Sequence, residues 1–109
     1  MVGEITPKEL WTQIQNGDSV QVIDIRPVED YEAGHIPGAE NIPYIEFIRE
    51  ISNHEWDDDI VVACPKGESS LQAARLLESY EGIDENTTIL NLTGGYSAWD
   101  YDLDARKPD

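Results

Sequence analysis

Residues 60–63, Ile-Val-Val-Ala, form an apolar run that leads directly into Cys64, the only cysteine of the chain. Short apolar runs of this kind are typical of buried strands in a parallel sheet. A loop that contains Gly67 follows, and a helical pattern begins near Ser69. The segment therefore predicts a buried strand, a tight loop and a helix in direct succession.

Strand and helix patterns alternate along the rest of the chain as well. Thr6-Pro7-Lys8-Glu9 has the form of a capping box with proline at the first helical position, so a helix is predicted over 7–15. The other predicted elements are strands over 20–25, 39–42 and 88–92, helices over 43–51, 69–80 and 95–100, and a short helical turn over 27–31. This alternation predicts an α/β fold with a mostly parallel sheet of about five strands and helices on both faces.

The length is sufficient for one hydrophobic core, so residues 1–109 are predicted to form a single domain. Residues 102–109 are expected to be a frayed tail. Three motifs stand at the carboxyl ends of predicted strands: Asp24 with Arg26, Cys64, and Thr93 with Gly94-Gly95. Because ligands of an open parallel sheet bind beyond these ends, the three motifs are expected to converge on one site.

Cys64 is expected to be a nucleophile because of its place between a strand and a helix. A loop that opens a helix presents its N–H groups at the positive end of the helix dipole. That environment stabilises a thiolate and lowers the pKa of a thiol. The competing interpretation is that Cys64 is a small buried apolar residue at a strand end, which is common for a free cysteine.

Several motifs resemble those of the rhodanese-like (sulfurtransferase) family, in the same order and at the same spacings. They are Asp24-Ile25-Arg26-Pro27, Gly34-His35-Ile36-Pro37-Gly38-Ala39, Cys64-x-x-Gly67-x-Ser69 with Ser70 behind it, and Gly94-Gly95-Tyr96-Ser97-Ala98-Trp99. The resemblance covers nearly the whole chain. It implies that Cys64 carries sulfur as a persulfide, that His35 ties down its own loop, and that Ser70, Gly94 and Gly95 support the site. It implies no cofactor.

The loop after Cys64 is predicted to be a cradle that binds an anion. Its amides can point inward around a thiolate, a persulfide or a thiosulfate-like donor. The predicted binding residues are Pro65, Lys66, Gly67, Glu68 and Ser69. Pro65 has no N–H, Lys66 adds a positive charge, and Glu68 should oppose the entry of thiosulfate. Ser69 is expected to cap the helix, with a contact to the sulfur as a second role.

A cysteine in a phosphate-sized cradle also suggests a cysteine phosphatase. That chemistry needs an arginine at the end of the loop, which holds the phosphoryl group with two parallel hydrogen bonds. This chain has Ser70 at that position. The missing arginine argues against a phosphatase.

Asp24 and Arg26 are interpreted as structural, with contact to the substrate as the alternative. Asp24 can accept hydrogen bonds from neighbouring loop amides, and Arg26 is expected to pair with Glu29, Asp30 or Glu32. No metal site is predicted, because the two histidines of the chain have no second cysteine to complete a ligand set.

The chain is strongly acidic, with 23 Asp and Glu against 7 Lys and Arg and a net charge of −16. Such a surface argues against nucleic acid and anionic membranes as partners. Because the acidic residues are scattered and lysine is scarce, we infer adaptation to high internal salt, as in a halophilic archaeon. The alternative is an ordinary acidic protein with a basic partner.

The resemblance and the position of Cys64 thus predict a sulfurtransferase. A cytoplasmic location is expected because the sequence shows neither a membrane span nor a signal peptide. Its expected partners are a small-molecule sulfur donor and a thiol acceptor or sulfur-carrier protein. The second hypothesis is a rhodanese-like binding module that docks a partner without turnover.

Overall fold

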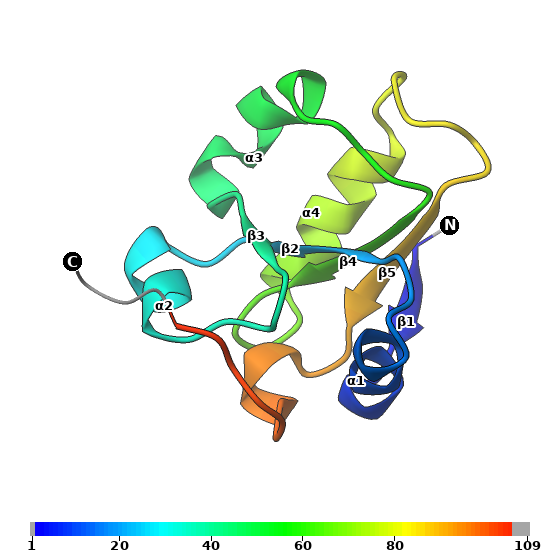
Figure 1. Cartoon of the computed structure of the whole chain (residues 1–109). Coiled ribbons are helices and arrows are strands. Elements are labelled where there is room, and N and C mark those ends of the chain that lie inside the picture. Colours follow the sequence, from blue (N-terminus) through cyan, green and yellow to red (C-terminus); the bar gives the residue numbers. More distant parts are fainter. Residues whose placement is uncertain (1, 106–109) are drawn as a thin grey trace.

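Five parallel strands form the central sheet of the computed structural model, which describes residues 2–105 (Figure 1). In chain order the strands are β1 (Gly3–Ile5), β2 (Gln21–Asp24), β3 (Glu40–Asn41), β4 (Asp59–Ala63) and β5 (Thr88–Leu92). Their spatial order is β1-β5-β4-β2-β3, and every pairing is parallel. The predicted α/β fold class is therefore confirmed.

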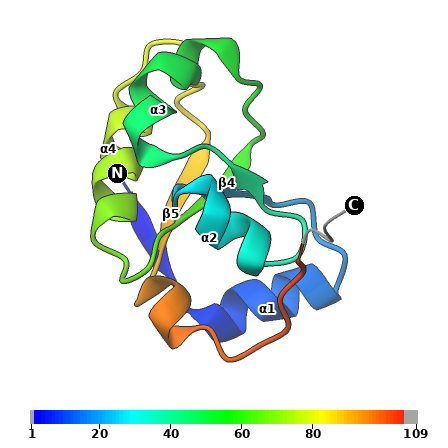
Figure 2. The same ribbon diagram turned by 90° about the vertical axis from the view of Figure 1, so that its left-hand side faces the viewer.

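Helices lie on both faces of this sheet, as Figure 2 shows from the side. The helices are α1 (Pro7–Gln15), α2 (Val28–Ala33), α3 (Tyr44–Glu50) and α4 (Ser69–Glu78), with short 3-10 turns at η1 (Ile51–Asn53) and η2 (Gly95–Ala98). Helices α3 and α4 cover one face, and α1 covers the other. Within the described residues, no helix is long and apolar enough to cross a membrane.

Two hydrophobic clusters, one on each face, fill the space between the sheet and its helices. On the α3 and α4 side, Phe47 and Leu77 pack with Ile23 and Val62. On the other side, Leu10 of α1 packs with Val61 and Trp99. Strand β4 contributes to both clusters because alternate side chains of a strand point to opposite faces.

Helix α1 begins where the sequence predicts it. Thr6 is the N-cap, its side chain accepts a hydrogen bond from the Glu9 amide, and the Glu9 carboxylate accepts one from the Thr6 amide. These hydrogen bonds from Thr6 lower the pKa of Glu9 below its usual value. The reciprocal arrangement satisfies two backbone N–H groups that the first turn of a helix leaves unpaired.

The structure corrects several predicted elements. Strand β1 was not predicted at all, and the helix predicted over 95–100 is the 3-10 turn η2, Gly95–Ala98. The expectation of a frayed tail is wrong for its first residues. Asp104 exchanges two backbone hydrogen bonds with His35, and the Asp102 carbonyl accepts one from the Trp99 ring N–H. Residues 106–109 of the expected tail lie outside the described residues.

Candidate active site

Cys64 directly follows β4, and helix α4 begins at Ser69. The Cys64 side chain is buried, with 1% of the residue exposed. It lies at the base of a small open pocket of about 150 Å³. The pocket is lined by Cys64, Pro65, Lys66, Glu68 and Ser69. Four of the five predicted binding residues therefore surround the same hollow as the predicted nucleophile.

Two groups contact the sulfur of Cys64. The amide of Gly67 donates a hydrogen bond to Sγ at 3.0 Å, and the thiol donates to Oγ of Ser70, also at 3.0 Å. Gly67 has φ of +87°, which is the left-handed region that favours glycine. This turn brings the Gly67 amide back toward the strand end, where it donates to Sγ.

The predicted capping role of Ser69 is wrong, and its predicted contact with the sulfur stays a prediction. Glu68 occupies the N-cap position of α4, and no side chain makes a capping hydrogen bond there. Ser69 is already the first residue of the helix and is exposed at the pocket, while Ser70 is fully buried against the sulfur. Successive helical residues face different directions, so one position decides which hydroxyl reaches Sγ.

Gly94 and Gly95 lie directly beneath the Cys64 loop. A Cβ at Gly95 would be 2.8 Å from both Gly67 N and the Pro65 carbonyl carbon, and closer still to the Cys64 carbonyl oxygen. The turn η2 then secures the loop. The Tyr96 amide donates to the Cys64 carbonyl at 2.9 Å, and Ser97 donates to the Pro65 carbonyl through both its amide and its hydroxyl.

A chain of buried polar groups supports the sulfur from the sheet side. Ser70 Oγ donates to Oδ1 of Asn91, a β5 residue that is 3% exposed. The Asn91 amide group donates to the Gly67 carbonyl at 3.0 Å and to both carboxylate oxygens of Glu4 at 3.3 Å. Because Glu4 is paired in register with Asn91, the added strand β1 brings a carboxylate within reach of the site.

Asp24 and Arg26 form their own ion pair instead of pairing with helix α2. Asp24 is fully buried, and its carboxylate receives hydrogen bonds from the Arg26 amide and guanidinium and from the Tyr96 hydroxyl. The predicted pairing of Arg26 with Glu29, Asp30 or Glu32 is therefore wrong.

Tyr96 joins this ion pair to the Cys64 loop. Its ring lies 3.5 Å from the Arg26 guanidinium carbon, and its amide holds the Cys64 carbonyl. Burial, and next the negative charge of Asp24, raise the pKa of the Tyr96 hydroxyl. Burial disfavours the charged Arg26, but the hydrogen bonds and charge of Asp24 outweigh it and raise the Arg26 pKa. Tyr96 therefore stays a neutral hydrogen-bond donor, and Arg26 stays charged.

His35 ties its loop to the preceding helix α2. Its Nδ1 lies 2.8 Å from the Tyr31 carbonyl oxygen, and its ring stacks on the Tyr31 ring with 3.9 Å between centroids. The described residues hold no group of three or more His, Cys, Asp or Glu that could bind a metal ion.

Comparison with known proteins agrees with this geometry. The model of the rhodanese-like domain family matches residues 6–102 of the chain. The chain belongs to the rhodanese-like family. Within the family it is 37% identical to the thiosulfate sulfurtransferase GlpE of Shewanella oneidensis over 80% of this chain and 82% of that protein. It is 28% identical to a putative sulfur carrier protein, YrkF, of Bacillus subtilis, over 90% of this chain but only 51% of that protein's length.

Solved rhodanese-like structures have the same fold over almost the entire chain. A rhodanese-like domain protein from Staphylococcus aureus superposes with a TM-score of 0.81 and 25% identity, and the match covers 97% of this chain and 100% of that one. The human single-domain sulfurtransferase TSTD1 gives a TM-score of 0.75 with 27% identity over 91% of this chain and 96% of that one. The predicted family is thus confirmed.

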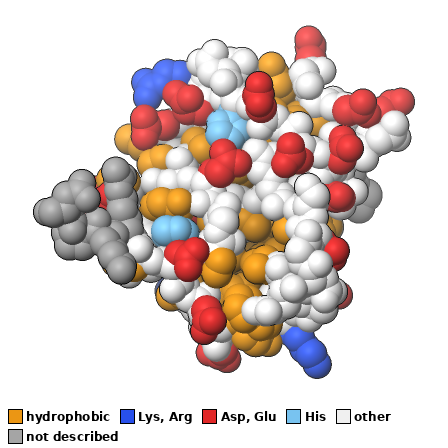
Figure 3. Space-filling model, viewed as in Figure 1, with side chains coloured by type: hydrophobic (Ala, Val, Ile, Leu, Met, Phe, Trp, Pro, Cys, Tyr) orange, Lys and Arg blue, Asp and Glu red, His pale blue; other side chains and the backbone are white. Residues whose placement is uncertain are grey.

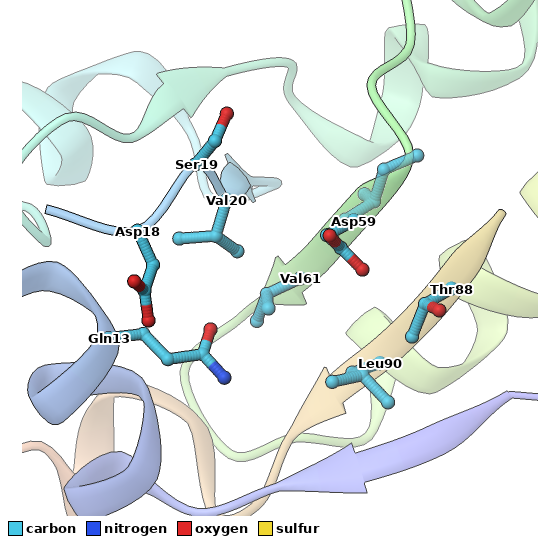
Figure 4. A pocket seen from close by; sticks show the side chains of 9 residues that line it. Gln13, Asp18, Ser19, Val20, Asp59, Val61, Thr88 and Leu90 are labelled. Atoms are coloured by element: carbon cyan, nitrogen blue, oxygen red, sulfur yellow. The ribbon is translucent and has the colours of Figure 1, made fainter. Parts of the chain in front are cut away.

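A larger hollow of this rhodanese-like domain lies elsewhere. It measures about 440 Å³ and lies at the amino ends of β4 and β5, between Asp59, Thr88 and the Asp18 region (Figure 4). Ligands of parallel sheets bind at the opposite edge, and no residue lining this hollow is a cysteine or histidine. The smaller pocket above Cys64 is therefore the candidate active site of the rhodanese-like domain.

Sequence reasoning missed several residues of the rhodanese-like site. Asn91 lies in a predicted strand, Tyr96 is most simply a core aromatic, and Glu4 carries no predicted role. Tyr96 stood inside a motif that resembled the family, so its role could have been suspected. No signal marked Glu4 or Asn91, because their contact depends on the unpredicted strand β1.

Proposed function

We propose that this protein is a sulfurtransferase that carries sulfane sulfur on Cys64. The observation that supports it most is the environment of Sγ: an inward-pointing amide and a buried hydroxyl at 3.0 Å, beneath an open pocket at the start of a helix. A backbone N–H aimed at Sγ and a helix N-terminus beside it are features of a site that accepts negative charge during a reaction. The membership of the family and the sulfurtransferase names of the relatives support the same chemistry.

The proposed reaction has two displacements. With thiosulfate as donor, the Cys64 thiolate attacks the outer sulfur, an S–S bond forms to Sγ, and the S–S bond to the sulfite group breaks. Sulfite leaves with the bonding electron pair. An acceptor nucleophile, such as cyanide or a thiolate, then attacks the outer sulfur of the persulfide and returns the Cys64 thiolate. No net oxidation occurs, so no redox cofactor is required.

The acceptor in this proposal is external. Cys64 is the only cysteine, so no second thiol of the chain can attack its persulfide. The pocket admits a small donor, and a thiol acceptor or a sulfur-carrier protein would approach the same opening. A cytoplasmic location, where thiols stay reduced, is part of this proposal.

Mass spectrometry after incubation with thiosulfate tests the proposal. We expect the protein to gain the mass of one sulfur atom, to keep it when acceptor is withheld, and to lose it when cyanide is added, with formation of thiocyanate. Protein that never gains sulfur from thiosulfate or from a persulfide donor would refute the sulfurtransferase proposal. That result would favour the binding module.

Two opposite charges that line the pocket should change the rate at which an anionic donor loads sulfur. Lys66 and Glu68 both line the pocket and are exposed. At low salt we expect Lys66→Ala to slow loading by thiosulfate, and Glu68→Gln to speed it, by up to about fivefold each. The rate of sulfur loading, followed by mass in samples quenched at fixed times, is measured at low and at high salt. Because salt screens exposed charges, both effects should shrink at high salt, and unchanged rates at low salt would contradict the proposed electrostatics.

We also propose that the acidic surface is an adaptation to high salt. Asp and Glu side chains are scattered over the face shown in Figure 3, and acidic residues outnumber basic ones by 23 to 7. Because salt screens the repulsion among them, the unfolding temperature should rise between low and molar potassium chloride. Thermal unfolding at both concentrations measures it, and a constant or falling temperature would eliminate the salt adaptation.

A further inference from the structure

The hydroxyl of Ser70 lies between two groups that compete for its single proton. Its oxygen is 3.0 Å from Sγ of Cys64 and also within hydrogen-bond distance of Oδ1 of Asn91. Ser70 is fully buried, so its hydroxyl cannot exchange either of these partners for bulk water. In the state that the structure shows, the thiol donates to Ser70 and Ser70 donates to Asn91.

Asn91 cannot turn its amide to relieve this competition. Its NH₂ group donates to the Gly67 carbonyl at 3.0 Å and to the Glu4 carboxylate at 3.3 Å. A flipped amide would place Oδ1 against these two acceptors and leave both without a donor. Asn91 therefore keeps its oxygen directed at Ser70.

Loss of the Cys64 proton changes what the sulfur requires. The thiolate has no proton to give, and it is stabilised by donors rather than by a lone pair of Ser70. Ser70 can donate to the thiolate only by turning its O–H away from Asn91. Once the thiolate has formed a bond to a second sulfur, Sγ carries little charge and the O–H can return to Asn91.

We propose that Asn91 is a positioning residue that withholds the Ser70 proton from Cys64, so that the hydroxyl switches between Asn91 and the thiolate during the sulfur-transfer cycle. This inference rests on the proposed function only in taking Cys64 as the reacting thiol. In this arrangement Asn91 weakens the stabilisation of the free thiolate, whereas the Ser70–Asn91 hydrogen bond stays intact beside the thiol and beside the persulfide.

Few charged groups surround this switch. Glu4 on β1 contacts Asn91, and Lys66 and Glu68 lie on the exposed loop. Strand β5 and the first turn of α4, residues 69–72, carry no charged residue, and the one charge of β4, Asp59, lies at its far end. Glu4 is thus the charge whose effect must be separated from that of the Ser70 hydroxyl.

The test is the pH dependence of Cys64 alkylation by iodoacetamide, a neutral reagent, followed by mass. Asn91→Leu keeps the branching of asparagine but removes its oxygen and NH₂, and it frees the Ser70 proton for the thiolate. We expect the midpoint of alkylation to fall by about one pH unit, equivalent to about 1.4 kcal/mol. In a Ser70→Ala background the same substitution should shift the midpoint by less than about a third of that amount.

One further variant separates the effect of the Glu4 charge from that of the Ser70 hydroxyl. Glu4→Gln removes the charge but keeps an oxygen that accepts from Asn91, and we expect its midpoint to stay within about 0.3 pH unit of the parent, because Glu4 is exposed and screened. If Asn91→Leu does not fold, Asn91→Ala serves with the same expectation.

Each outcome decides the inference. It is overturned if the Asn91 variant leaves the midpoint unchanged or raises it, if the shift persists undiminished without the Ser70 hydroxyl, or if Glu4→Gln produces the same shift. The alkylation assay uses no sulfur donor. If the protein loads sulfur but the Asn91 variant shows no shift, the proposed function stands and this inference fails. If the shift appears but the protein never loads sulfur, this inference stands and the proposed function fails.

Discussion

Replacing Cys64 by serine is expected to abolish sulfur transfer and to leave the fold intact. A hydroxyl is close to a thiol in size but is too weakly acidic and too poor a nucleophile to form or carry a persulfide. We expect no gain of sulfur mass with thiosulfate, and no thiocyanate above the uncatalysed rate when cyanide is present.

The stability of this variant is the second half of the prediction. The serine hydroxyl would lie between the Gly67 amide and the Ser70 hydroxyl, so it would have both a donor and an acceptor. A buried hydroxyl with partners costs little, and we expect a change in unfolding free energy of about 1 kcal/mol or less. Thermal unfolding measures it. Residual sulfur loading in the serine variant would contradict the role of Cys64, because the chain contains no other thiol.

The elements that position the site could be predicted because their signals are local. The helix α1 has its capping box within four consecutive residues, and the structure places its bounds at Pro7–Gln15 as predicted. The apolar run before Cys64 is strand β4, and the glycine after it makes the turn that returns the chain to the sulfur. In both cases the physical cause lies within one turn or one strand of sequence.

The contacts that failed prediction depend on distant parts of the chain. Strand β1 contains only Gly3–Ile5, which is too short to show an alternating pattern, and it forms by pairing with β5 at the other end of the chain. Glu4 therefore gave no sign that it would contact Asn91. A three-residue strand gains its stability from its neighbour rather than from its own residues.

The partner of Arg26 failed prediction for a different reason. Helix α2 carries three carboxylates close to Arg26 in the sequence. Asp24 is fully buried, so leaving its carboxylate without a counter-charge would cost more free energy, and Arg26 pairs with it. An unpaired buried carboxylate is far more costly than an exposed one. Burial of Asp24 follows from the position of β2 between β4 and β3, which sequence proximity to α2 does not reveal.

Substituting Gly95 by alanine is expected to be the most disruptive change outside the nucleophile. Gly95 has φ of +58°, and a Cβ there would meet backbone atoms of Cys64, Pro65 and Gly67. Backbone cannot rotate away as a side chain can, so the loop around the sulfur must move. We expect a loss of about 2–4 kcal/mol of unfolding free energy, a fall of roughly 10 °C or more in unfolding temperature, and loss of sulfur loading.

Gly17→Ala is the matched control. Gly17 has φ of +75°, but a Cβ there would have no atom within 4 Å. Both variants therefore include the cost of a left-handed alanine, about 1 kcal/mol, and only the Gly95 variant adds the collision with the Cys64 loop. Thermal unfolding and thiosulfate loading of the two variants separate these contributions. If Gly95→Ala were no less stable than Gly17→Ala and still gained sulfur, the loop would not depend on its contact with η2, and the cradle around Cys64 would have to be held by the Gly67 turn and Ser70 alone.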